Sequence, residues 1–284
     1  MPITQTPLRY PGGKSQLTPY IIEVLKANDL IGGAYAEPFA GGCGVACKLL
    51  VDAYVGEIAI NDIDPAVYAF WASVVRHADE LCELIFRTPV TMAEWHRQRD
   101  VFLRRRSRQL DLGFATLFLN RTNRSGILKG GVIGGQSQNG EYLLDCRFNK
   151  EELIRKIQRI ALYRHSIKVS RLDAKEFLRD RVPKMSKWTL CNIDPPYFGK
   201  GEALYTSFYR PDDHASLAES IAKLKRQWIV TYDDVPEIRA LYSKFRTVRT
   251  ALTYSAQVKR SGVELLIAGP GVHLPALDSR RRAA

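Results

Sequence analysis

An α/β fold with a doubly wound, mostly parallel sheet is predicted by three features of the sequence. Seven strand-like apolar runs recur along the chain, and helix-like segments separate most of them, as in sheets whose parallel strands are joined by crossover helices. The last two runs have only Thr253 to Gly262 between them, too short for such a crossover, so the last strand is expected to be antiparallel. The alternation fails between about Leu81 and Asn149, which indicates an inserted, mainly helical region.

The predicted elements follow one another along the rest of the chain. Helical segments carry apolar residues at a spacing of three and four, and Pro65 stands at a first helical position, where proline is tolerated. The expected strands are Ala34 to Glu37, Glu57 to Asn61, Ile167 to Ser170, Trp188 to Asp194, Gln227 to Tyr232, Phe245 to Leu252 and Val263 to Ala268. The expected helices are Gln16 to Lys26, Val45 to Ala53, Pro65 to Arg76, Lys150 to Tyr163 and His214 to Leu224.

The composition points to a soluble, basic protein. The 284 residues include 42 Lys and Arg and 30 Asp and Glu, which gives a formal charge of +12. This charge favours a polyanionic partner. The five cysteines are odd in number and lack paired metal-ligand spacing, so we expect neither a disulfide framework nor a metal site. No leader pattern and no run of roughly 18 apolar residues is present, so we expect a cytoplasmic protein without a membrane partner.

Asp194-Pro195-Pro196-Tyr197 ends one of the strand-like runs. Because proline cannot continue a sheet ladder, the chain must leave the sheet here, with Asp194 at the carboxyl end of the strand, where open α/β sheets bind their ligands. The tetrapeptide combines hydrogen-bond acceptors with an aromatic surface. Taken alone, it could also be a tight turn that closes a strand.

A glycine-rich turn, Ala36 to Gly44, follows the first strand and opens a helix. Glycines in this position let a nucleotide-like ligand approach the backbone near a helix N-terminus. Asp62 ends the second strand, where an acid in such folds accepts hydrogen bonds from ribose hydroxyls. Asp64, just before Pro65, is better placed to cap the next helix.

The segment Leu8 to Ser15 has glycines before a Lys-Ser pair, as phosphate-binding loops do. The loop pattern requires a glycine where Leu8 stands, which argues against a nucleotide triphosphatase. An ordinary helix start with a surface lysine is the alternative.

Taken together, these segments resemble the DNA adenine-N6 methyltransferases related to the bacterial Dam methylase, the D12 class or alpha group of amino-methyltransferases. The resemblance covers most of the chain, and its elements stand in the order of the family. They are Tyr10-Pro11-Gly12-Gly13-Lys14, Glu37 to Gly44, Asn61-Asp62-Ile63-Asp64, Leu119-Asn120-Arg121 and Asp194 to Tyr197. The predicted fold is then a Rossmann-like methyltransferase domain formed by residues 1–80 and 150–284, with 81–149 as an inserted target-recognition domain.

The resemblance implies that the chain binds S-adenosylmethionine. Asp62 would bind the ribose, Asp194 would lie near the methionine moiety, and Asp173 would contact the adenine ring. Asp173 suits a helix N-cap equally well, with Glu176 completing a capping box. The full implied cofactor set is Tyr10, Lys14, Glu37, Phe39, Gly41, Gly42, Gly44, Asp62, Asp173 and Asp194.

The resemblance also implies a direct methyl transfer at Asp194, Pro195, Pro196 and Tyr197. The adenine amine is a poor nucleophile, so the Asp194 carboxylate and the Pro195 carbonyl would accept its two hydrogens, while Tyr197 stacks on the base. Since the target atom lies inside a duplex, the base would have to be flipped out of the helix.

Contacts with double-stranded DNA are expected from the inserted region. Its arginine cluster either lines a phosphate-binding face or is a solvated helix end. The loop after it supplies donors and acceptors that suit base edges, although Arg124 to Gly135 departs from the Dam pattern, which puts a GATC target in doubt. The predicted contacts are Arg104, Arg105, Asn120, Arg121, Asn123 and Arg124.

The resemblance thus implies a site-specific, adenine-specific DNA methyltransferase, for which a monomer would suffice. A phage, a mobile element or a restriction-modification system with a cognate endonuclease would be its setting. An RNA adenine-N6 methyltransferase and a non-catalytic DNA-binding regulator with the same fold are the alternatives.

Overall fold

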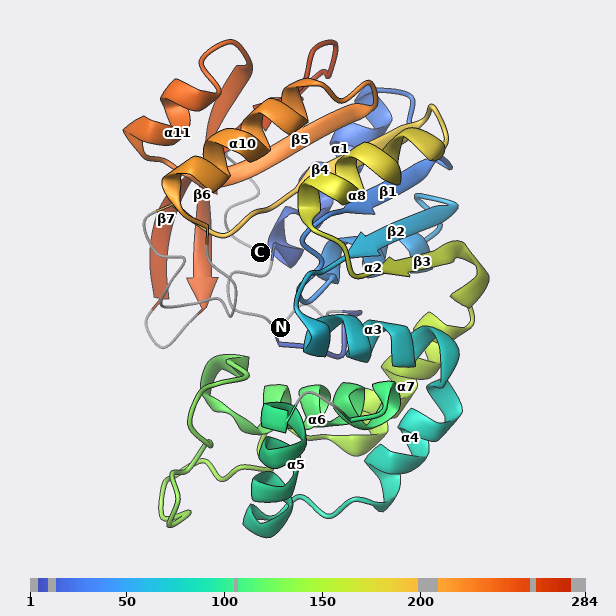
Figure 1. Ribbon diagram of the computed structural model, residues 1–284, viewed down its shortest axis with the longest axis vertical. Helices are drawn as coiled ribbons and strands as arrows, with labels where there is room; N and C mark the ends of the chain where they lie inside the picture. The colour runs from blue at the N-terminus through green and yellow to red at the C-terminus, as the bar shows by residue number, and fades with distance from the viewer. Residues whose placement is uncertain (1–4, 10–13, 105–106, 199–208, 256–258, 277–284) are drawn as a thin grey trace.

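The computed structural model describes residues 5–9, 14–104, 107–198, 209–255 and 259–276, with backbone only over 251–255 and 259–263 (Figure 1). Its centre is a seven-stranded sheet in the order β3-β2-β1-β4-β5-β7-β6. The strands are β1 (Ala34–Glu37), β2 (Glu57–Asn61), β3 (Ile167–Ser170), β4 (Thr189–Ile193), β5 (Gln227–Asp233), β6 (Arg246–Ser255) and β7 (Lys259–Ala268).

The sheet is parallel from β3 to β5, whereas β7 runs antiparallel to both of its neighbours, β5 and β6. The predicted mostly parallel sheet with an antiparallel last strand is therefore confirmed. The strand order reverses between β1 and β4, which are neighbours in the sheet but distant in sequence. In open α/β sheets, the crevice at such a reversal is where ligands bind.

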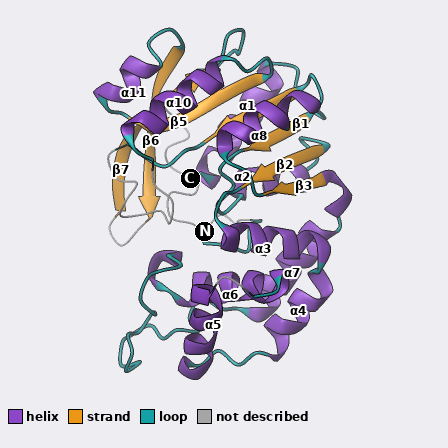
Figure 2. Ribbon diagram, in the orientation of Figure 1, coloured by secondary structure: helices purple, strands orange, loops and turns teal. Residues whose placement is uncertain are grey.

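Two helical layers cover the faces of the sheet (Figure 2). Side chains alternate along each strand, so Tyr35 packs with α1 (Thr18–Ala27) and α2 (Gly44–Val51), while Ala36 packs on the opposite face. The opposite layer consists of α8 (Ala174–Asp180), α10 (Pro211–Ala222) and α11 (Pro236–Leu241). The central strands β1 and β4 are buried at every position, as expected for parallel strands covered on both sides.

A helical region lies beside the carboxyl ends of the strands (Figure 1). It contains α3 (Pro65–Arg76), α4 (Ala78–Arg87), α5 (Met92–Arg104), α6 (Gln109–Thr122) and α7 (Lys150–Ala161). The helix α6 is buried on nearly all sides, because α3 and α5 pack against it. Its core is continuous with the core under the sheet, and α7 packs on α4, so the division at residues 81 and 149 stays a prediction.

Prolines explain where two helices depart from their predicted limits. A short 3-10 turn, Ser15–Leu17, precedes α1, because Pro19 is accommodated only in the first turn of an α-helix. The helix α10 begins at Pro211, before the predicted His214, and the Asp213 carboxylate accepts a hydrogen bond from the Arg210 amide at 2.9 Å. Neither of these shifts moves a residue of the site.

In the part of the chain that the structure describes, no helix is long and apolar enough to cross a membrane. The described residues likewise contain no group of three or more His, Cys, Asp or Glu side chains placed to hold a metal ion.

Candidate active site

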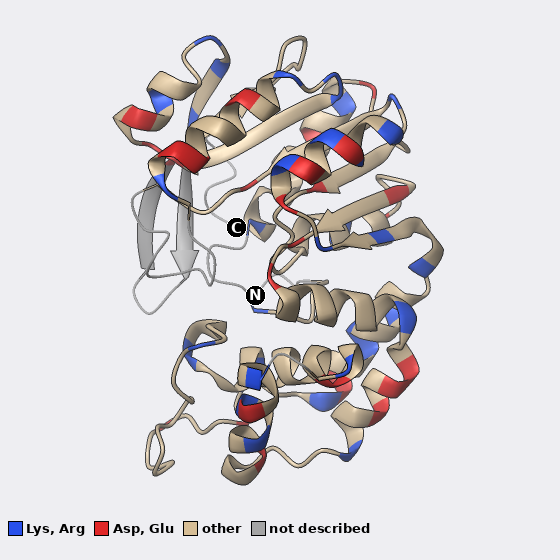
Figure 3. Cartoon of the chain, viewed as in Figure 1, with Lys and Arg blue, Asp and Glu red and all other residues tan. Residues whose placement is uncertain are grey.

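Acidic side chains gather where the parallel strands end. Glu37 ends β1, Asp62 follows β2, Asp194 follows β4 and Asp233 ends β5. Figure 3 shows acidic positions along these strand ends, next to the helical region. The reversal of strand order lies between Glu37 and Asp194, so the site occupies the ligand-binding edge of the fold.

The Asp194 carboxylate is held in place and partly exposed. Its Oδ1 accepts a hydrogen bond of 2.7 Å from Thr231 Oγ1 and lies 3.4 Å from Lys14 Nζ, while a quarter of the side chain remains accessible (25%). Burial raises the pKa of Asp194, and the Lys14 ammonium and the Thr231 hydroxyl act in the opposite direction. An acceptor with accessible surface therefore stands at the end of β4.

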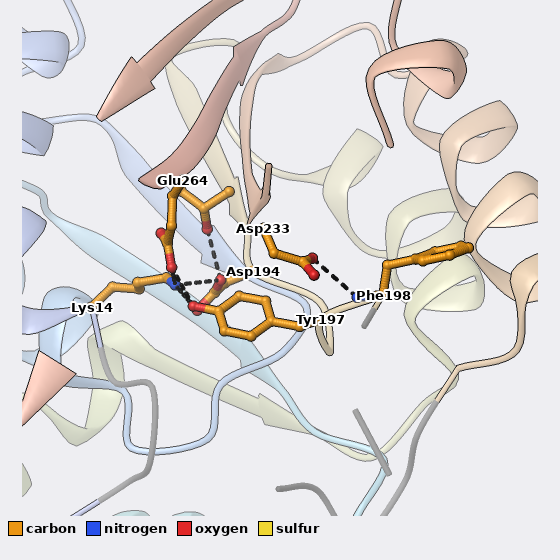
Figure 4. A network of polar contacts seen from close by, with 7 residues as sticks. Lys14, Asp194, Tyr197, Phe198, Asp233 and Glu264 are labelled. Carbon is orange, nitrogen blue, oxygen red and sulfur yellow. Dashed lines mark hydrogen bonds and ion pairs between the residues drawn. The ribbon is translucent and has the colours of Figure 1, made fainter. Parts of the chain in front are cut away.

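A buried network joins Lys14 and Tyr197 to Glu264 (Figure 4). Lys14 Nζ lies 2.7 Å from Glu264 Oε1, donates to the Tyr197 hydroxyl, and sits 4.7 Å from the centre of the Tyr197 ring. The Tyr197 hydroxyl donates to Glu264 Oε1. These bonds fix the position of the tyrosine ring beside Asp194.

Sequence reasoning missed Glu264 and Thr231. Glu264 stands opposite Asp233 in the pairing of β7 with β5, and that antiparallel pairing brings it to the site. One signal was available, because Glu264 is the one charged residue of the apolar run Val263 to Ala268. Thr231, inside β5, has no comparable signal.

The glycine-rich turn after β1 is tied to the end of β2. The Gly41 amide donates to Asp62 Oδ2 at 2.9 Å, and the Gly41 carbonyl accepts from Trp71 Nε1 at 2.9 Å. Gly41 and Cys43 both have positive φ, 45° and 50°, a conformation that favours glycine. At Gly44, which opens α2, a β-carbon would lie 2.1 Å from Ser15 Oγ. The turn therefore has little room for side chains.

Asp62 and Asp64 divide two roles between them. Asp64 caps α3 by accepting from the Ala66 amide at 2.7 Å, as expected. Asp62 Oδ1 accepts from the Asp64 amide at 3.0 Å, and its side chain is half-buried. Burial raises the pKa of Asp62 to about 7, although its two backbone partners act to lower it.

Asn61 binds the ends of three strands together and was not recognised as a site residue in its own right. Its amide donates to the carbonyls of Pro38 and Leu172 at 3.1 and 2.9 Å, and its Oδ1 accepts from Ser170 Oγ and from the Leu172 amide at 2.8 and 2.9 Å. The side chain is buried. It thereby fixes the turn after β1 relative to β3.

Glu37 and Phe39 flank the turn in different environments. The Glu37 carboxyl is buried, and burial raises its pKa to about 8, with the nearby Asp194 contributing. The Phe39 ring packs edge-on against Tyr209, with ring centres 5.8 Å apart. Gly42 lies between the two positive-φ residues of the turn.

A family model described as D12 class N6 adenine-specific DNA methyltransferase matches residues 10–256. The chain belongs to this family. It is thus an enzyme of the adenine-specific DNA methyltransferase type. Methyltransferases in general use S-adenosylmethionine. A search among curated proteins found no match.

Two solved structures are similar to most of the chain at low identity. One is a Pyrococcus horikoshii protein proposed, in its description, as an RNA methyltransferase, with 11% identity, 92% of this chain and 84% of that chain covered, and a TM-score of 0.44. The other is the precorrin 8w decarboxylase of Methanobacterium thermoautotrophicum, with 12% identity, 89% of each chain covered and a TM-score of 0.36. Both scores are too low to carry an argument about this D12 class enzyme.

In this D12 class enzyme, Asp173 is the N-cap of α8. Its Oδ1 accepts from the Lys175 amide at 2.9 Å. The capping role is therefore confirmed, and contact with an adenine ring stays a prediction. Tyr10 and Arg105 lie outside the described residues.

Two of the predicted DNA contacts lie in the interior. The Asn120 side chain bonds to the amide and carbonyl of Arg9 at 2.7 and 2.6 Å and to the Gly126 carbonyl at 2.9 Å. Asn123 accepts from Trp95 Nε1 at 2.8 Å and donates to two carbonyls of the following loop. Both asparagines are 1% exposed, so direct contact with a base would require these bonds to break.

The three described arginines of the predicted set differ in exposure. Arg104 ends α5 and Arg124 follows α6, and both are exposed. Arg121 is half-buried, and burial, followed by repulsion from Arg9, lowers its pKa to about 10. Among the described arginines of the predicted set, Arg104 and Arg124 are the two that a polyanion can reach from solvent.

Proposed function

We propose that the chain transfers the methyl group of S-adenosylmethionine to the N6 amine of adenine in double-stranded DNA. One observation carries this proposal: Asp194, at the reversal of strand order, keeps accessible surface while Thr231 and Lys14 fix its carboxylate. The proposal is further supported by the family of the chain, whose description names the N6 position of adenine and DNA.

The residues at the strand ends fit S-adenosylmethionine. When bound, it supplies an electrophilic methyl group on a positively charged sulfur. Asp62 presents a half-buried carboxylate to ribose hydroxyls, and the Gly41 to Gly44 turn offers backbone without large side chains. Lys14 carries one positive charge against the two carboxylates of Asp194 and Glu264, so the edge favours a cation such as a sulfonium.

The chemistry required of the protein is to make an amine nucleophilic and to align it. The Asp194 carboxylate and the Pro195 carbonyl accept hydrogen bonds from the two amine hydrogens, which localises the nitrogen lone pair. Bound S-adenosylmethionine would supply the methyl group: the bond from N6 to the methyl carbon would form as the bond from sulfur broke, and the amine would then lose one proton to solvent. Pro196 keeps the backbone rigid, and Tyr197, tied to Glu264 and Lys14, holds its ring for stacking on the base.

We assign DNA contact to residues 81–149. The target adenine is flipped out of the duplex and enters the site at the strand ends. Arg104 and Arg124 contact the phosphates or base edges, as their exposure allows. Asn120 and Asn123 act indirectly, because they hold the backbone of the loop that follows α6. Arg121 supplies positive charge close to Arg9.

The test is transfer of labelled methyl from S-adenosylmethionine to unmethylated double-stranded DNA, alongside structured RNA, with methylated adenines mapped by sequencing. We expect N6-methyladenine within one short DNA motif. Transfer to RNA alone would contradict the substrate assignment. Absence of transfer to either, with cofactor binding intact, would favour a non-catalytic role.

A further inference from the structure

Glu264 lies outside every segment that resembles the family, yet it is central to the network beside Asp194 (Figure 4). Its side chain is buried, and Oε1 is shared by Lys14 and the Tyr197 hydroxyl. Burial raises the pKa of Glu264, with Asp194 adding to the rise and Lys14 opposing it. Burying a carboxylate is costly, and Lys14 and the Tyr197 hydroxyl are the partners that offset this cost.

Lys14 is divided between two carboxylates. Its Nζ is 2.7 Å from Glu264 Oε1 and 3.4 Å from Asp194 Oδ1. An ammonium is a compact charge that follows the strongest nearby anion. With Glu264 neutral, Asp194 would be the remaining charged partner, and the ammonium would move onto the carboxylate that the adenine amine needs.

We infer that Glu264 is a positioning residue, which holds Lys14 and the Tyr197 hydroxyl so that the Asp194 carboxylate stays available to the adenine amine. This inference rests on the proposed function. Lys14 serves two purposes in this arrangement: it stabilises the ionised Asp194 from a distance, and it anchors the tyrosine ring. Glu264 determines the balance between them.

The charged and titratable groups around this pair come from several elements. Glu264 faces Lys14, Asp194 and Tyr197. Asp194 also interacts with Glu37 of β1 and Tyr232 of β5. A substitution at Glu264 leaves Glu37 and Tyr232 unchanged. A change in the pKa of Asp194 therefore reports on Lys14 and Glu264.

The direct test follows the carboxyl carbon of Asp194 by NMR against pH, in protein carrying ¹³C at aspartate carboxyl groups and without cofactor or DNA. The resonance is assigned with Asp194→Asn. We expect Glu264→Gln to lower the apparent pKa of Asp194 by about one pH unit. In a Lys14→Gln background, the same substitution should give a much smaller shift. An unchanged pKa in the first variant overturns the inference.

Kinetics provide the second readout. Glu264→Gln should reduce kcat about tenfold to a hundredfold, with a smaller change in KM for S-adenosylmethionine, and Glu264→Asp should recover part of the loss. The matched control is Glu57→Gln, which changes a half-buried acid at the opposite end of β2 and should leave kcat unchanged. If Glu264→Gln does not fold, Glu264→Asp should still lower the pKa of Asp194, by a smaller amount, and no shift in that variant overturns the inference.

The outcomes separate this inference from the proposed function. An inactive wild-type protein on DNA counts against the proposed function, while the NMR shift still tests the link from Glu264 to Asp194. An active wild type whose Glu264→Gln variant keeps both its kcat and the pKa of Asp194 contradicts the inference alone.

Discussion

The strand-end site and the loop after α6 both contain clustered polar side chains, but they use them differently. At the strand ends, Lys14, Tyr197 and Glu264 bond to one another, and Asp194 keeps accessible surface. Asn120, in the last turn of α6, and Asn123, just after it, are buried and bond mainly to backbone groups of that loop and of Arg9, with one further bond from Trp95 to Asn123. Side chains that satisfy the backbone stabilise a loop, whereas side chains that satisfy one another can leave a neighbour ready for a ligand.

Removing the buried cation of the strand-end network should have the largest effect on stability. Lys14→Met leaves Asp194 and Glu264 without their shared partner, so the free energy of unfolding should fall by about 3–5 kcal/mol. Urea denaturation measures the change. The matched control is Lys168→Met, which breaks an exposed ion pair with Glu57 and should cost roughly 1 kcal/mol or less. If the free energy of unfolding fell equally in the two variants, the buried network would contribute no more to stability than an exposed ion pair does.

The loop after α6 should be sensitive at one glycine and tolerant at another. Gly126 has φ of +75°, and a β-carbon there would lie 2.1 Å from the Arg9 carbonyl oxygen. Gly126→Ala should therefore destabilise the protein by about 1–3 kcal/mol. Gly131→Ala is the matched control, since nothing lies within 4 Å of its β-carbon position. A comparable loss in both variants would argue against the close packing of Arg9 on this loop.

The buried Glu37 should make stability depend on pH. Burial raises its pKa from 4.5 to about 8, so folding favours the protonated carboxyl. This contribution is fully present below about pH 4.5 and is lost as the pH rises through about 8. Glu37→Gln, which mimics the protonated form, should flatten the decline between pH 5 and 9 in urea denaturation. A decline as steep as that of the wild type would show that Glu37 is ionised throughout.

The smallest expected effect is at Asp173. Asp173→Ala removes the cap of α8 and should lower stability by about 1 kcal/mol. Isothermal titration with S-adenosylmethionine then separates the two roles of this residue. A cap alone predicts nearly unchanged affinity, and contact with the adenine ring predicts a clear loss.

Much of the fold and part of the site could be predicted from the sequence. Alternating strands and helices, the proline-terminated β4 and the glycine-rich turn are local signals, and they placed Asp62 and Asp194 at strand ends. Glu264 and Thr231 were missed because strand pairing brings them to the site: β7 pairs with β5 and carries Glu264, and β5 pairs with β4 and places Thr231 beside Asp194. Burial of Asn120 and Asn123 depends on helices packing around α6, which no local pattern records.

The most direct test of the central claim is the single-turnover rate of methyl transfer to an adenine-containing duplex, measured for Asp194→Asn at saturating S-adenosylmethionine. The variant keeps the shape of the side chain but loses its charge. We predict a rate about 10²–10³-fold below that of the wild type, with the unfolding transition little changed. A rate within a few-fold of the wild type would contradict the assignment of Asp194 as the acceptor for the adenine amine.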